Sequence, residues 1–284
     1  MVRKHTRRAA KAAFAVSFGV ALLIGISVFG GAAHGGVQKA ASKPTIVLGT
    51  KNFGEEYILG QLYGQALQAK GFNVKYKGSF GSSELADVAI RKGKMNFYPE
   101  YTGVIALDLA KVKNPPKTAA ATYKVAQTYE QKHGQKLLKP TPFYDTDTFT
   151  MLKTTARKLG VKTIYKFTQH IKFVPLGTIS VYTLIDQKKV TAGDGYSTDP
   201  QQLQHNKYVA LTDTKHIFGF QNVAPVASKK LLAGSAGNLL ASICNKVSSK
   251  LTLAAIQAMN KAYVVNKATP KQIADGFLKA NGLK

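Results

Sequence analysis

The stretch that decides the fold is FGSSELADVAIRKGKMNFYPEYTG, residues 80–103. After an opening turn its apolar positions have helical spacing, which makes Ser82 or Ser83 a natural N-cap. Gly93 predicts the end of this helix, and residues 95–98 predict a short strand. The stretch therefore predicts a helix that is followed closely by a strand.

The end of the same stretch is where we expect a ligand. Pro99 predicts the end of the strand, and residues 100–103 lead into another apolar run. A helix N-terminus and a strand C-terminus then lie close together, at the edge where open α/β sheets bind small ligands. The residues also fit an ordinary strand–helix–strand unit whose Tyr101 packs under a loop, so this stretch alone leaves both interpretations open.

Strands and helices alternate on either side of this stretch. Residues 45–49 predict a buried strand, residues 55–70 an amphipathic helix that Gly71 ends, and residues 72–77 the next strand, which together form a parallel crossover. Farther along, we expect helices over residues 105–111, 119–131, 154–159, 182–189, from 231 onward, 252–263 and 270–280, and strands over residues 148–153, 171–176 and 208–211. Residues 197–200 predict an N-cap cluster with a proline behind it.

Two extended segments divide this pattern into two α/β lobes. Residues 139–147 and 217–226 have no helical period and predict crossovers between the lobes. We assign residues 43–142 plus 223–284 to lobe 1 and residues 143–222 to lobe 2. Such an arrangement implies a cleft between the lobes that closes on a ligand by hinge motion.

The N-terminus predicts export. Within residues 1–42, basic residues up to Lys11 precede an apolar run and then small residues, the order of a signal peptide, and cleavage after Ala33 fits. The run is also nearly long enough for an uncleaved membrane anchor. Both alternatives place the protein outside the cytoplasm, at the outer face of the membrane or in the periplasm or cell wall.

The formal net charge of the 284-residue chain is +26. Beyond the leader, Arg91 and Arg157 are the only arginines, and the lysines are spread along the chain. Readers of nucleic acid favour clustered arginine, so no specific nucleic acid is expected. A diffuse lysine coat fits a polyanionic cell wall or anionic lipid, or serves solubility alone. A basic surface binding protein or adhesin with a degenerate ligand site is the alternative that charge supports.

Enzyme signatures are missing from the sequence. It contains no Gly-x-Ser-x-Gly elbow, no metal-ligand pair at helical spacing and no Cys/His pairing. Cys244 is the only cysteine and lies in an apolar helical run, so we expect a buried thiol. The histidines have polar neighbours and are expected in solvent. No catalytic residue, metal or cofactor is therefore expected.

Four motifs resemble a known family: GTKNFGEEYILG (49–60), YPEYTG (98–103), GYSTD (195–199) and FGFQNVAPV (218–226). They are similar to the substrate-binding proteins of ABC importers for glycine betaine, choline and related osmoprotectants, and the resemblance covers nearly everything after Lys43. It implies the type II periplasmic-binding-protein fold, a quaternary ammonium ligand, and a membrane permease as partner. We expect a monomer.

The residues agree with that chemistry. A quaternary ammonium group has no hydrogen-bond donor and is held by aromatic faces. The sequence contains no tryptophan, so tyrosine and phenylalanine must form the cage, while Lys51 offers a charge for a carboxylate. The resemblance matches Lys51, Tyr101 and Tyr196 best and Tyr144 approximately. The candidate ligand-binding residues are Lys51, Asn52, Tyr101, Thr102, Tyr144, Asp145, Tyr196, Ser197, Thr198, Phe220 and Gln221.

Departures from the family pattern affect the expected ligand. Val104 replaces a frequent threonine, and Gln221 a frequent cage tyrosine. Residues 165–171 replace a strand and an arginine-bearing loop, so lobe 2 is expected to be shortened. This predicts either a compromised site or a ligand that lacks a carboxylate, as choline does. Such a ligand would use a nearby anion, for which Asp145, Asp147 and Asp199 are candidates.

Overall fold

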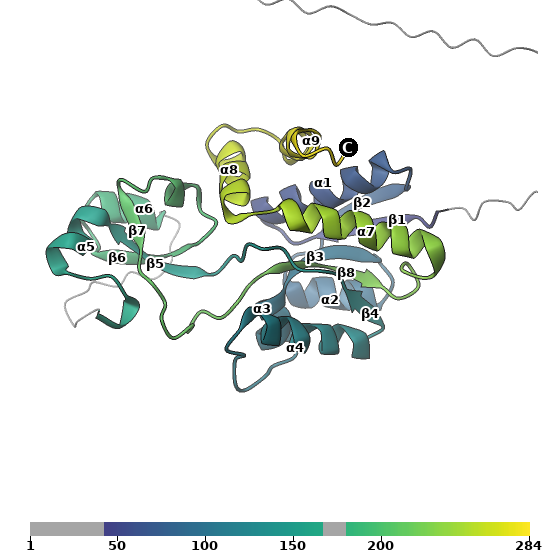
Figure 1. Ribbon diagram of the computed structural model, residues 1–284, viewed down its shortest axis with the longest axis horizontal. Coiled ribbons are helices and arrows are strands. Elements are labelled where there is room, and N and C mark those ends of the chain that lie inside the picture. The colour runs from purple at the N-terminus through teal and green to yellow at the C-terminus, as the bar shows by residue number, and fades with distance from the viewer. Residues whose placement is uncertain (1–42, 167–179) are drawn as a thin grey trace, which may run out of the picture. The chain divides into compact units, whose positions relative to one another are not determined.

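The computed structural model describes residues 43–166 and 180–284 (Figure 1). The expected leader, the expected strand at 171–176 and most of the segment at 165–171 lie outside the described residues. The predicted shortening of lobe 2 therefore stays a prediction. The lobe boundaries given above also stay predictions.

The larger sheet contains the stretch that decided the fold. In the described residues it has five strands in the order β2 (Val74–Ser79), β1 (Ile46–Thr50), β3 (Phe97–Tyr101), β8 (Val223–Ser228) and β4 (Gln135–Leu137). β1 pairs in parallel with β2 and β3, which confirms the predicted parallel crossover, whereas β8 is antiparallel to β3 and β4. The mixed sheet places the C-terminal end of β3 beside the loop that follows β1.

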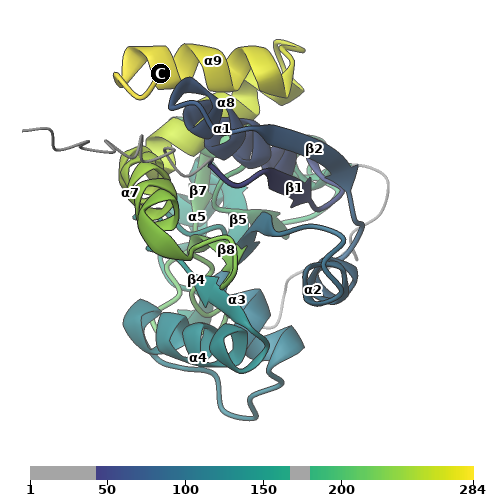
Figure 2. The same cartoon turned by 90° about the vertical axis from the view of Figure 1, so that its right-hand side faces the viewer.

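Helices cover both faces of this sheet (Figure 2). One face packs against α1 (Gly54–Ala69), α7 (Gly234–Lys250), α8 (Leu253–Val264) and α9 (Pro270–Ala280), with a core that includes Ile58, Leu62, Phe97 and Leu240. The other face packs against α2 (Ser83–Arg91), α4 (Ala119–Lys132) and a π-helical turn, η1 (Ile105–Leu109), which continues α3 (Thr102–Val104). Cys244 is fully buried on the first face, as predicted.

The smaller sheet is antiparallel. Among the described residues its strand order is β6 (Ala192–Tyr196), β5 (Asp147–Leu152) and β7 (Tyr208–Ala210). It carries α5 (Lys153–Leu159), α6 (Val181–Asp186) and two 3₁₀ turns, η2 (Ile164–Lys166) and η3 (Pro200–Leu203). Residues 138–146 and 211–222 connect it to the larger sheet, so the crossover segments of the pattern are present.

Several predicted helix ends are confirmed. The Ser82 hydroxyl accepts a hydrogen bond from the backbone N–H of Leu85 at 3.4 Å, and so begins α2. Thr269 forms a capping box with Gln272 at the start of α9. Such caps satisfy backbone donors that have no partner inside the helix.

The prediction that Pro99 ends its strand is wrong. β3 runs from Phe97 to Tyr101 with Pro99 at its centre, opposite Pro225 of β8. Neither proline has an N–H to donate, and β1 reaches β3 only in register with Phe97. The strand therefore continues through Pro99 without losing a ladder bond.

Other boundaries also differ from the expectation. Residues 197–200 do not cap a helix through a side chain: the carboxylate of Asp199 instead accepts hydrogen bonds from the Tyr196 N–H and the Tyr182 hydroxyl. The helix expected from 105 begins at Thr102, β2 begins two residues late, and the short strand β4 has no counterpart in the prediction. Side-chain acceptors in tight turns often bond locally instead of capping, which periodicity does not reveal.

Within the described ranges, no single helix is both long and apolar enough to cross a membrane. Only α7 and α8 taken together reach that length and composition, across a bend of 86°.

Candidate ligand site

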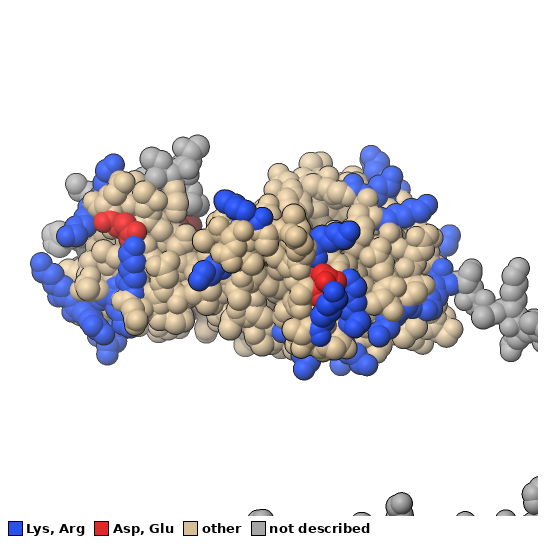
Figure 3. Space-filling view, turned by 90° about the horizontal axis from the view of Figure 1, so that it is seen from above, with Lys and Arg blue, Asp and Glu red and all other residues tan. Residues whose placement is uncertain are grey.

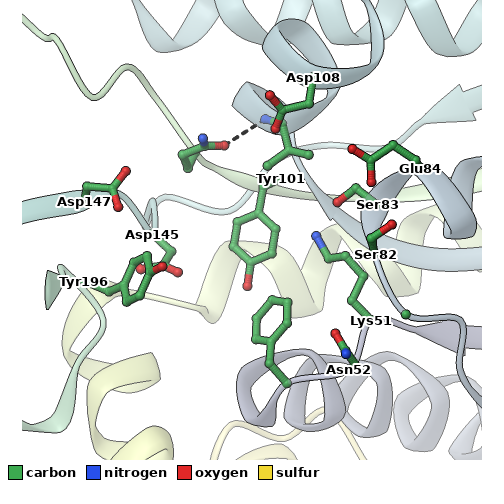
Figure 4. A pocket seen from close by; sticks show the side chains of 14 residues that line it. Lys51, Asn52, Ser82, Ser83, Glu84, Tyr101, Asp108, Asp145, Asp147 and Tyr196 are labelled. Atoms are coloured by element: carbon green, nitrogen blue, oxygen red, sulfur yellow. Dashed lines mark hydrogen bonds between the residues drawn. The ribbon is translucent and has the colours of Figure 1, made fainter. Parts of the chain in front are cut away.

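A pocket of about 360 Å³ opens where β1 and β3 end (Figure 4). Residues from both sheets and from the connecting segments line it: Lys51, Asn52, Phe53, Gly81, Ser82, Ser83, Glu84, Tyr101, Val104, Asp108, Asp145, Asp147, Tyr196 and Gln221. The N-terminus of α2 and the C-terminal end of β3 thus meet at one pocket. This is the geometry that residues 80–103 predicted.

The structure brings six of the predicted ligand residues to this pocket: Lys51, Asn52, Tyr101, Asp145, Tyr196 and Gln221. The other five lie elsewhere. Thr102 is buried and donates to the carbonyl of Phe220 at 3.3 Å. Thr198 lines an adjoining pocket of about 450 Å³, whereas Tyr144, Ser197 and Phe220 line another of about 300 Å³. The ligand roles of all eleven residues stay predictions.

Aromatic rings form one part of the lining. Tyr101 is 4% exposed, and the centroid of its ring lies 6.1 Å from that of Phe53. Tyr196 is 45% exposed and lies on the other side of Tyr101 from Lys51 (Figure 4). Phe53 was not among the predicted residues, although its place directly after Asn52 in the β1–α1 loop was a usable signal.

Lys51 already has partners inside the protein. It is 4% exposed, and its ammonium group forms an ion pair with Glu100 and lies 3.8 Å from Glu56. The same nitrogen lies 4.3 Å from the centroid of the Tyr101 ring. Because two carboxylates compete for this charge, little of it remains for a ligand carboxylate.

A chain of hydrogen bonds joins the Tyr101 ring to Thr198, in the turn that follows strand β6 of the smaller sheet. The Tyr101 hydroxyl donates to Glu55 Oε1 at 2.7 Å, and Asn260 Nδ2 donates to Glu55 Oε2 at 2.7 Å. Asn260 also donates to the carbonyl of Thr198 at 3.1 Å, and the Thr198 hydroxyl donates to Asp145 Oδ1 at 2.8 Å. Burial raises the pKa of Glu55. Sequence reasoning missed Glu55 and Asn260, which are far apart in the chain.

Carboxylates dominate the charge of the pocket. Glu84, Asp108, Asp145 and Asp147 line it, and Lys51 is the one basic residue among the described residues that do so. Burial raises the pKa of Asp145 to about 8, with the nearby Glu55 as the next cause, and burial also raises the pKa of Asp147. A pocket this acidic in a chain of net charge +26 attracts cations.

Gln221 closes the pocket beside β3. Its Oε1 accepts a hydrogen bond from the Val104 N–H at 2.9 Å, drawn as the dashed line in Figure 4. The same oxygen would lie 2.5 Å from a Cβ added at Gly103, so this amide position requires glycine there. Gln221 thus fixes the backbone at the start of α3.

Comparison with known sequences identifies the family. A sequence model described as the substrate-binding domain of the ABC-type glycine betaine transport system matches residues 44–178 and 172–280. The chain belongs to this family. It is a substrate-binding protein of the ABC-type glycine betaine transport family, as its four motifs predicted, with a small ligand and an ABC transporter as its partners.

Individual relatives are distant. The chain is 26% identical over 284 aligned residues to a glycine-betaine-binding protein of Pseudomonas aeruginosa PAO1, covering 86% of this chain and 90% of that relative. It is 22% identical to an ergothioneine transport permease/ergothioneine binding protein of Helicobacter pylori, covering 87% of this chain and 49% of that longer protein. These substrates are stated for the relatives only.

Solved structures show the same fold. A glycine betaine/carnitine/choline ABC transporter structure has a TM-score of 0.74 at 20% identity, covering 84% of this chain and 99% of that one. Lactococcal OpuAC, closed on glycine betaine, has a TM-score of 0.59 at 18% identity, with coverages of 84% and 96%. A choline-binding protein with choline bound has a TM-score of 0.55 at 11% identity, with coverages of 84% and 89%. The predicted type II periplasmic-binding-protein fold is thereby confirmed.

Proposed function

We propose that this substrate-binding protein captures a quaternary ammonium cation in the pocket described above and delivers it to the permease of an ABC transporter. The observation that carries the proposal is the pairing of aromatic rings with carboxylates around one pocket. Phe53, Tyr101 and Tyr196 offer ring faces, and four carboxylates surround them. The protein acts as a monomer outside the cytoplasm, where its predicted leader would direct it.

The chemistry of the lining favours a cation that has no carboxylate of its own. An aromatic face attracts a cation with about 0.5–2 kcal/mol, depending on how fully the pair is desolvated. The carboxylate of glycine betaine would face the carboxylates of Asp108 and Asp147, while Lys51 is held by Glu100. Choline has only an uncharged hydroxyl at that end, and this hydroxyl can donate a hydrogen bond to a carboxylate. We therefore expect choline to bind more tightly than glycine betaine.

Isothermal titration calorimetry with choline, glycine betaine, carnitine and proline betaine tests this function. Choline should give a saturable heat and should raise the melting temperature, because a ligand that binds only the folded state stabilises it by mass action. Glycine betaine should bind at least about tenfold more weakly, the equivalent of about 1.4 kcal/mol. No heat and no thermal shift with any of the four compounds would refute the proposal.

A further inference from the structure

The charges of this protein are sorted between its interior and its surface. All 14 acidic residues lie in the described part of the chain. Four line the ligand pocket, and five are buried: Glu55, Glu56, Asp87, Glu100 and Glu130. Asp194 and Asp199 belong to β6 and the turn after it. Only Asp186, Asp213 and Asp275 remain for the rest of the surface.

Even those three carboxylates are occupied. Asp186 forms an ion pair with Lys207 at 2.6 Å, and Asp275 forms one with Lys279 at 2.7 Å. Asp213 accepts hydrogen bonds from the backbone N–H groups of Lys215 and Phe218. The surface outside the pocket therefore presents basic side chains almost without anions, as Figure 3 shows for one face.

One part of this surface combines basic charge with exposed apolar groups. We call it the α5–η2 patch, and it consists of the exposed residues Arg157, Lys158, Leu159, Lys162, Tyr165 and Lys166. Leu159 is 53% exposed and Tyr165 46%. The Nζ of Lys215 lies 3.9 Å from the centroid of the Tyr165 ring and adds a further positive charge.

No carboxylate of the described residues neutralises this patch. The sequence has no acidic residue between Asp147 and Asp186, and none of the four basic side chains of the patch pairs with a carboxylate in the described residues. Leu159 and Tyr165 add exposed apolar surface to these unpaired cations. The chemistry of the patch therefore fits a partner that is both anionic and partly apolar.

We propose that the α5–η2 patch binds the surface of an anionic phospholipid bilayer. Lysine and arginine attract lipid phosphates, and their aliphatic stems can lie along apolar surface. Tyrosine and leucine enter the boundary between headgroups and acyl chains. Nucleic acid fits less well, because the patch has a single arginine and a single aromatic ring for base contacts.

The position of the patch is compatible with ligand capture. None of its residues lines the ligand pocket, so the patch and the pocket can be occupied together. Attachment to the bilayer would raise the effective concentration of the receptor at its membrane permease without any new contact to the permease. The inference does not depend on which ligand the pocket takes.

Vesicle co-sedimentation tests the proposal. The chain from residue 43, which contains both sheets and their cores, avoids a contribution from the basic leader. It should bind vesicles of phosphatidylglycerol and phosphatidylcholine but not vesicles of phosphatidylcholine alone. Reversing Lys158, Lys162 and Lys166 to glutamate should lower binding at least about a hundredfold, since each basic residue near an anionic surface contributes about fivefold.

A matched variant controls for net charge. Lys113, Lys117 and Lys230 are exposed lobe 1 lysines without an ion pair in the described residues, and their reversal to glutamate changes the charge equally. This variant should retain most of the binding. Leu159→Ser should lower binding about threefold while every charge is kept. An equal loss of vesicle binding in both charge-reversal variants would overturn the proposal. Binding of the wild type to duplex DNA as tightly as to the anionic vesicles would also overturn it.

Discussion

The hydroxyl of Tyr101 donates a hydrogen bond to Glu55 Oε1 at 2.7 Å, at the base of the ligand pocket. The second oxygen of Glu55 is held by Asn260, which also holds the backbone carbonyl of Thr198. A ring at the end of β3 is thus connected through two buried side chains to the turn that follows Tyr196. The position of one face of the pocket depends on residues that do not line it.

Replacing Asn260 by alanine should weaken choline binding about tenfold. The change leaves a buried oxygen of Glu55 without its donor, which costs about 1–3 kcal/mol, and it frees the turn that carries Tyr196. Calorimetry well below the melting temperature measures the effect. Asn266→Ala, at an exposed position of the loop after α8, is the control. A lower melting temperature with unchanged choline affinity would limit Asn260 to a structural role.

Replacing Tyr196 by alanine should raise the Kd for choline at least about tenfold, because one ring face is lost. Tyr165 is a matched control, since the two side chains are 45% and 46% exposed and only Tyr196 lines the pocket. Both alanine variants should melt at nearly the same temperature as the wild type. Equal choline affinity in the two variants would remove Tyr196 from the cage.

Replacing Asp147 by asparagine should change the order of ligand preference. Choline loses a favourable charge, so its affinity should fall severalfold, whereas glycine betaine loses a repulsion and should bind as well or better. Parallel titrations of both ligands measure the ratio of the two affinities. Asp186→Asn, which removes a carboxylate outside the pocket, should leave that ratio unchanged. A ratio that is also unchanged in Asp147→Asn would contradict the acidic-pocket explanation.

Choline affinity should rise with pH between about 6 and 9. Burial raises the pKa of Asp145 to about 8, so this carboxyl is largely protonated at pH 6 and ionised at pH 9. A cation binds the ionised form better, and choline binding should therefore release a proton near neutral pH. Calorimetry at pH 7 in two buffers of different ionisation enthalpy detects that proton. Asp145→Asn should sharply reduce both the proton release and the pH dependence.

The stability of the protein without ligand should have the opposite pH dependence. Glu130 is fully buried with neither oxygen hydrogen-bonded in the described residues, and burial raises its pKa from 4.5 to about 8. Between these two values the folded state keeps a proton that the unfolded state releases, so the free energy of unfolding falls as the pH rises. Glu130→Gln should reduce this fall and stabilise the protein at pH 9 by a few kcal/mol, on the order of 1.4 kcal/mol per unit of pKa shift.

Melting temperatures at pH 5, 7 and 9 measure this effect. Glu84→Gln, at an exposed glutamate, is the control and should leave the pH profile unchanged. A wild-type protein whose melting temperature is the same at pH 5 and pH 9 would show that Glu130 is not the buried carboxylic acid that the structure indicates.

Much of the fold was predictable because periodicity and caps are local signals. The apolar stripe of α1 and the capping box at Thr269 lie in single short windows of sequence. The end of β3 was misplaced because Pro99 is tolerated where β1, about 50 positions away in the chain, pairs with β3 only at Phe97. The three-residue strand β4 is too short to have a period. These errors arise where a distant partner decides the local structure or where an element is too short to show a period.

The residues of the site that lie within motifs were predictable, and their buried partners were not. Lys51, Tyr101 and Tyr196 lie within motifs and meet at the pocket. The partners of those residues do not follow from any window of sequence, because Asn260 is 205 positions from Glu55. Lys51 was expected to hold a ligand carboxylate, but the sequence does not reveal that Glu100 approaches its ammonium group. Buried networks of this kind are assembled by topology.

The sorting of charge has a consequence for how fast a ligand arrives. Seen from several nanometres away, the molecule is a positive body that repels an approaching cation, and attraction begins only at the mouth of the pocket. Dissolved salt shortens the reach of the repulsion to about 10 Å at 0.1 M. It weakens the attraction between the cation and the desolvated carboxylates of the pocket much less. Raised ionic strength would therefore quicken the encounter of a cation with this receptor instead of slowing it.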